Sequence, residues 1–174
     1  MLKDFGLLAL RGVYGGLFTG HGSQKLFGWF GGPGVEGTTE MMDSMGLNPP
    51  KPWATMAGGS EFAGGVLTTL GLLHPIGPIL KLGPMVTATR QMHWKTPVWA
   101  TEGGAELPLT NIAIAVALAT QHPGKLSLDY LLGIKVPKAV TLAVLAGVAA
   151  GLITSEVQTA SGDDDEEQTS AEAD

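Results

Sequence analysis

The sequence predicts an all-α protein, a polytopic bundle of membrane helices, from three observations. Charged residues make up 15% of the 174-residue chain, well below the quarter or so usual in soluble domains. Five segments approach the roughly 20 mostly apolar residues that a membrane-spanning helix needs. Tryptophan, glycine and proline gather at the ends of these segments, where rings suit the headgroup zone and glycine and proline end regular structure.

The five segments are of uneven quality as membrane helices. They cover residues 5–25, 53–73, 76–94, 104–121 and 137–154. The first three contain charged side chains, and the last two are short and rich in alanine. Each is marginal alone, but five of them in one small chain favour a bundle.

The first segment has two contrasting helical faces. The glycine face carries Gly12, Gly16 and Gly20, and the opposite, polar and aromatic stripe carries Arg11, Tyr14, Phe18, His21 and Lys25. Small residues every four positions let helices approach closely in lipid. We expect the glycine face to pack within the monomer, with a homo-oligomer interface as the alternative.

The connection after this segment contains three methionines that fall on one face of a short helix, Met41, Met42 and Met45. One interpretation is a short helix packed on the bundle. The other is an adaptable apolar gate over a ligand cavity, because methionine fills irregular space easily.

The second segment carries the carboxylate that we expect to pair with Arg11. A charged side chain near the membrane midplane is unfavourable by a few kcal/mol, so Arg11 should point inward to a counter-charge. Glu61 lies at a similar predicted depth, eight residues after Trp53. The pair either fixes the register of the helices or lines a polar cavity whose protonation state matters to a ligand.

The third and fourth segments add polar groups near a membrane face. Pro84 predicts a kink in the third. His93 ends that segment and Glu106 opens the next, so both could converge with His21 on a metal or a quinone headgroup. The alternative is simple contact with interfacial water. These residues lack a dedicated metal-ligand spacing, so we predict no metal site.

The end of the chain adds a helix and an acidic tail. Gly147 and Gly151 form a second small-residue pair, either for packing within the chain or for a homo-oligomer interface. Residues 163–174 hold seven of the sixteen acidic groups, and such runs are most often disordered. The chain has no cysteine, so thiol chemistry within it is impossible. It has no basic patch, which argues against nucleic acid as a partner.

Three stretches of the sequence resemble the DoxX family of small integral membrane proteins. They are the run from His21 to Gly34; Glu61 with Ala63, Gly64 and Gly65; and His93 followed by residues 101–109. Residues 123–129 resemble the segment that closes the family domain. The resemblance covers roughly residues 7–132, whereas the fifth helix and the tail lie outside it.

The resemblance implies a four-helix DoxX-like domain over residues 1–133, followed by an additional transmembrane helix over 134–155 and the acidic tail over 156–174. It also implies a multi-pass protein of the plasma membrane with its N-terminus inside. The expected function is an accessory or quinone-interacting subunit of a membrane redox or oxidative-stress system, with a redox partner protein. Its ligand or cavity residues would be Arg11, His21, Lys25, Glu61, His93 and Glu106. The alternatives are a small carrier for a lipid-like or anionic substrate and a purely structural scaffold. The catalytic residues, if any, are not predicted.

Overall fold

The computed structural model describes the backbone of residues 1–94 and 96–172 and the side chains as far as residue 160, apart from residue 95. Every regular element in these residues is helical, which confirms the all-α prediction. The elements are α1 (Leu2–Phe27), η1 (Trp29–Gly31), α2 (Gly34–Ser44), α3 (Pro50–Leu70), α4 (Ile76–Leu80), α5 (Leu82–Thr87), η2 (Ala88–Met92), η3 (Ala100–Glu102), α6 (Glu106–Thr120), α7 (Leu128–Leu132) and α8 (Lys138–Glu172).

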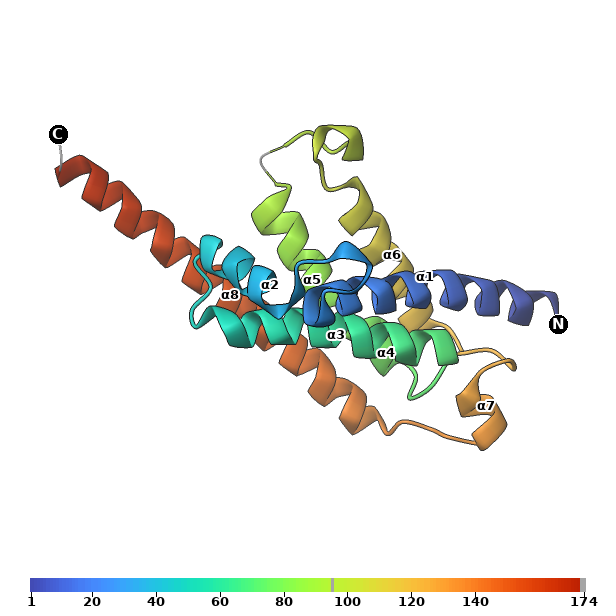
Figure 1. Ribbon diagram of the computed structural model, residues 1–174. Helices are drawn as coiled ribbons and strands as arrows, with labels where there is room; N and C mark the ends of the chain where they lie inside the picture. Colours follow the sequence, from blue (N-terminus) through green and yellow to red (C-terminus); the bar gives the residue numbers. More distant parts are fainter. Residues whose placement is uncertain (95, 173–174) are drawn as a thin grey trace.

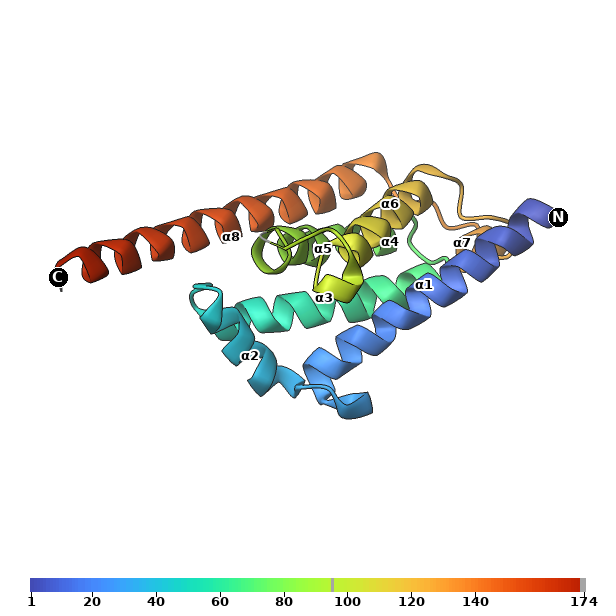
Figure 2. The same ribbon diagram turned by 90° about the horizontal axis from the view of Figure 1, so that it is seen from above.

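The helices form three layers, which Figure 2 shows from above. α1 and α3 pack along each other on one side, α4, α5 and α6 lie in the middle, and α8 lies on the other side. α2 packs across the ends of α1 and α3 (Figure 1). α8 extends well beyond the other helices toward the C-terminus.

Glycines set the close contact between α1 and α3, but they are not the glycines that the sequence pattern predicted. A Cβ added at Gly15 would lie 2.7 Å from the carbonyl oxygen of Gly65, and one at Gly22 would meet the backbone of Phe62. A Cβ at any glycine of the predicted face, Gly12, Gly16 or Gly20, would meet nothing within 4 Å. The prediction that this face packs within the monomer is therefore wrong.

The physical reason is the polar stripe on the other side of α1. Arg11, Tyr14 and Phe18 are all buried, and the charge of Arg11 accounts for the orientation of this face, because a charged side chain in a membrane helix is less unfavourable in the bundle interior than facing lipid. Gly15 and Gly22 fall on that same face of the helix, at i+4 and i+11 from Arg11. The face of α1 that packs closely on α3 is therefore the same face that buries Arg11, and the face with Gly12 points outward.

The third predicted segment is broken into short pieces, which confirms the expected kink. Pro84 has no N–H to donate to the carbonyl of Leu80, and the helix is interrupted at Lys81, between α4 and α5. The segment ends in a single π-helical stretch, η2, where the Thr89 hydroxyl donates to the Met85 carbonyl at 2.8 Å.

One described helix, Lys138–Ala160, is by itself long and apolar enough to cross a membrane, and it is almost entirely exposed. The other apolar helix of note, α6, is shorter. Glycines and charged or hydroxyl side chains make α1 and α3 less apolar, so the number of spans stays a prediction.

α8 continues past its predicted end at Thr154, and residues beyond that point hold it against the other helices. Gln158 exchanges hydrogen bonds with the backbone of Asn48, at 3.2 and 2.7 Å. Arg90 in η2 pairs with Glu156 at 3.1 Å. Residues 156–160, which the prediction placed in the acidic tail, therefore belong to α8 and contact the rest of the bundle. The side chains of the tail beyond residue 160 lie outside the described residues.

Candidate functional site

A cavity of about 390 Å³ lies between α2, α3, the α5–η2 segment and α8. Five of the seven methionines of the chain line it: Met41, Met42, Met45, Met56 and Met92. The rest of the wall is mostly apolar, and Lys25 is the one charged residue among the lining side chains of the described chain. Such an apolar cavity with few polar groups is typical of a small-molecule site.

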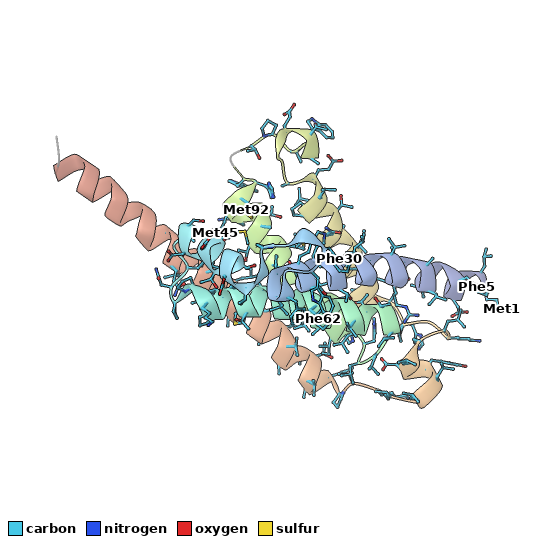
Figure 3. All side chains as sticks on the ribbon, in the orientation of Figure 1. Met1, Phe5, Phe30, Met45, Phe62 and Met92 are labelled. Carbon is cyan, nitrogen blue, oxygen red and sulfur yellow. The ribbon has the colours of Figure 1, made fainter. Side chains whose placement is uncertain are left out.

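The short helix α2 forms one wall of this cavity. Met42 packs with Leu47 and Ala54 in a small core that fixes α2 on α3. The Thr38 hydroxyl contacts the carbonyl oxygens of Lys25 and Gly34, at 3.2 and 2.7 Å, which ties α2 to the end of α1. Met45, directly after α2, and Met92 of η2, both labelled in Figure 3, line the same cavity. Met41, Met42 and Met45 therefore lie against a cavity, as the gate interpretation expects.

Lys25 forms an ion pair beside the cavity with a buried carboxylate. Its Nζ lies 2.6 Å from Oε1 of Glu61, a carboxylate that is only 1% exposed. The other carboxylate oxygen, Oε2, has no hydrogen-bond partner among the described residues. Gly58 allows the close approach, because a Cβ there would lie 3.1 Å from Cβ of Lys25.

The predicted contact between Arg11 and Glu61 is wrong. Arg11 instead donates from Nη2 to the carbonyl oxygen of Leu126 at 2.9 Å. The error lies in the register of two helices that run in opposite directions. Contacts at Gly15–Gly65 and Gly22–Phe62 place Arg11 beside Gly71 and Glu61 beside Lys25.

Arg11 belongs to a second polar cluster at the other end of α1. The negative charge nearest to Arg11 in this cluster is the carboxylate of Asp129. The same carboxylate caps the turn between α3 and α4, because it accepts hydrogen bonds from the backbone N–H of Leu73 at 2.8 Å and of His74 at 2.7 Å. The backbone N–H of Asp129 donates to Gly71 at 3.1 Å. Partial burial lowers the pKa of His74 below its ordinary value of 6.5.

The same end is closed by the N-terminus of α1. The backbone N–H of Lys125 donates to the carboxylate of Asp4 at 2.8 Å, and this hydrogen bond is the main cause of the lowered pKa of Asp4. The segment 123–129 therefore closes the bundle by contacts with α1 and with the turn after α3.

Lys81 is a buried cation that the sequence analysis missed. Its side chain is fully buried, and its Nζ donates to the hydroxyl of Thr68 at 2.7 Å and lies 4.0 Å from the ring centroid of Tyr14. No carboxylate pairs with it among the described residues. The signal was present, since Lys81 is a charged residue inside the segment 76–94.

The structure does not bring His21, His93 and Glu106 together. His21 contacts Gln24 on its own helix, with Nδ1 3.1 Å from Oε1. His93 hydrogen-bonds to the carbonyl of Gly103, and Glu106 accepts from the backbone N–H of Ala100 at 2.9 Å. Each is thus used within its own loop or helix, and no group of three potential metal ligands from His, Cys, Asp and Glu occurs among the described residues.

Comparison with known proteins identifies the family but nothing finer. The family model for DoxX matches residues 6–94, which include most of α1, all of α2 and α3, and the broken segment 76–94. Of the stretches that carried the resemblance, the first two lie inside this match. No curated protein and no solved structure matches the chain. Because the match covers half of the sequence, the chain belongs to the DoxX family, whose members are membrane-associated.

Proposed function

We propose that this protein binds a membrane-soluble quinone in the methionine-lined cavity and acts as an accessory subunit of a membrane redox system. The observation that carries the proposal is an apolar cavity of about 390 Å³ with a single charged side chain, Lys25, in its wall. A quinone needs apolar surroundings for its ring and tail and a hydrogen-bond donor for its carbonyl oxygen.

The charge balance beside the cavity favours a neutral ligand over an anionic one. An ammonium has three N–H donors, and Glu61 engages one of them at 2.6 Å. The others can donate to a ligand while the ion pair stays intact. An anion would compete with Glu61 for Lys25, and a buried carboxylate without a partner is strongly unfavourable. A quinone carbonyl accepts a hydrogen bond without this conflict.

The methionine walls suit the same ligand. Thioethers are polarisable and flexible, and they make favourable contacts with flat unsaturated rings. Met42 is held in the core of α2, whereas Met56 and Met92 are about half exposed. The cavity therefore combines a fixed wall with side chains that can adapt to a bound ring.

The proposed setting is a multi-pass protein in the plasma membrane, with a redox partner protein that supplies or removes the quinone's electrons. The chain has no cysteine for electron transfer. The bundle would contribute binding and orientation of the quinone, and electron transfer would involve the partner. When bound, the quinone would supply the two-electron chemistry.

Titration calorimetry on the purified full chain in detergent, with menadione as the probe, tests this proposal. We expect saturable binding that weakens about tenfold or more in Lys25→Met, because a hydrogen bond from a charged donor contributes about 1.5–3 kcal/mol. Since Lys25→Met leaves Glu61 unpaired, the double variant Lys25→Met/Glu61→Leu removes both charges and keeps the fold testable.

Lys51→Met is the matched control, because Lys51 is an exposed lysine of α3 that does not line the cavity. It should bind menadione as the native chain does. Absence of binding by the native chain would refute the proposal, and so would equal binding by the double variant. Tight binding of oleic acid without menadione would instead support the carrier alternative.

A further inference from the structure

We infer that Gly147 and Gly151 of α8 form a flat floor for the ring of the ligand and select planar cyclic ligands over acyl chains. This inference rests on the proposed function and concerns residues that the sequence suggested for helix packing or oligomerisation. It assigns the two glycines to ligand recognition.

Both glycines line the cavity, together with Val144, Val148 and Leu152 of the same helix. A Cβ added at Gly147 or Gly151 would meet no heavy atom within 4 Å. The missing side chains are therefore not required by a close helix contact within the chain. They leave empty space on the cavity side of α8, where the backbone itself forms the wall.

The glycines of the α1–α3 contact show what packing glycines look like in this protein. A Cβ at Gly15 or Gly65 would lie 2.7 Å from a carbonyl oxygen of the other helix. Those glycines cannot be replaced without moving a helix. Gly147 and Gly151 can, because the space in front of them belongs to the cavity.

Because Gly147 and Gly151 lie one helical turn apart and have no side chains, the backbone of that turn of α8 forms a flat surface in the cavity wall. Met41, Met42 and Met45, in and directly after α2, line the same cavity together with Met92 of η2 (Met45 and Met92 are labelled in Figure 3). A rigid ring placed between this surface and the methionines would contact backbone on one side and thioethers on the other. Lys25 would then meet a carbonyl at the edge of the ring.

The geometry distinguishes a ring from a flexible chain. A methyl group on the floor reduces the width of the slot, and a rigid planar ring cannot bend around it. An acyl chain can adopt other rotamers and pass beside it. Added methyl groups should therefore affect the two kinds of ligand differently.

The experiment compares the double variant Gly147→Ala/Gly151→Ala with the native full chain in detergent, using menadione and oleyl alcohol, a neutral ligand with a flexible chain, as probes. We expect menadione binding to weaken at least tenfold and oleyl alcohol binding to change less than threefold. The thermal midpoint should stay the same or rise, since alanine favours helix more than glycine does. The matched control, Gly12→Ala/Gly16→Ala, places the same change on an open glycine face outside the cavity and should leave both affinities unchanged.

Each outcome decides the inference. Menadione binding within twofold of native in the cavity variant would overturn the floor assignment while leaving the proposed function standing. Equal weakening for menadione and oleyl alcohol would also overturn it, because the cavity would then select by ligand volume and not by ring shape. Failure of the native chain to bind menadione would overturn both the floor and the proposed function.

Discussion

Each end of α1 carries a cation near a carboxylate, with Arg11 buried at one end and Lys25 partly buried at the other. The two ends use the cation differently. At one end, the carboxylate that faces Arg11, Asp129, also holds two backbone N–H groups of the turn after α3. At the other end, Lys25 holds Glu61 but also faces a cavity of about 390 Å³. At the Arg11 end, Nη2 donates to the Leu126 carbonyl at 2.9 Å, Nε and Nη1 have no hydrogen-bond partner among the described residues, and the adjacent space is only about 10 Å³. The Lys25 end differs because its ammonium lies beside the large cavity. The comparison indicates that Arg11 stabilises the packing of the bundle, whereas Lys25 is positioned to bind a ligand.

The substitution with the largest expected effect on stability is Gly71→Ala, at the Arg11 end of α1. Gly71 has a φ of +61°, and a Cβ there would collide with the guanidinium of Arg11 and approach Cβ of Ser127. We expect a loss of about 3 kcal/mol or more in the free energy of unfolding, from backbone strain and overpacking together. Thermal unfolding in detergent measures it.

The matched control for this change is Gly16→Ala, where a Cβ meets nothing within 4 Å. It should unfold at or above the native temperature. If Gly71→Ala proved as stable as Gly16→Ala, the Arg11 end would not be the tightly closed region that the structure indicates.

An intermediate effect is expected for Asp129→Asn. The amide keeps one acceptor oxygen but places an NH₂ group where the second oxygen accepted from backbone, and it removes the charge that faces Arg11. We expect a loss of about 2 kcal/mol in stability, measured by thermal unfolding, with menadione affinity unchanged. A large loss of menadione binding in a folded Asp129→Asn protein would contradict the division between the two ends.

The sequence predicted the helices of this protein better than their mutual register. Hydropathy and proline placed the segments, including the kink at Pro84, because these depend on local composition. The partner of Arg11 depends on how far α3 slides along α1, and that is fixed by Gly15, Gly22 and Gly65, whose contacts no local pattern reveals. The position of Glu61 relative to Trp53 therefore predicted a contact with Arg11 that the structure does not show.

The candidate site was predicted in part for the same reason. Lys25, Glu61 and the methionines of α2 were all singled out, and the structure brings them to one region. Gly147 and Gly151 were expected to pack or to form an interface, because a small-residue pair in a sequence does not show which side of the helix faces a cavity. Lys81 was overlooked although it is a charged residue inside the segment 76–94.

The smallest effect is expected for a third cation, the buried Lys81, and it tests most closely how Arg11 and Lys25 differ. Lys81 has neither the backbone hydrogen bond of Arg11 nor the carboxylate of Lys25, and its ammonium contacts the hydroxyl of Thr68 and the ring of Tyr14. In Lys81→Met the Thr68 hydroxyl still donates to the Gly64 carbonyl at 2.7 Å, so no buried polar group loses its only partner. Methionine has a similar length and removes the cost of burying an ammonium without an opposite charge. We therefore expect a gain of about 1 kcal/mol in thermal unfolding measurements, whereas Lys25→Met, which leaves Glu61 unpaired, should lose stability. A loss for Lys81→Met as large as that for Lys25→Met would mean that the buried ammonium of Lys81 is held as firmly as a paired one.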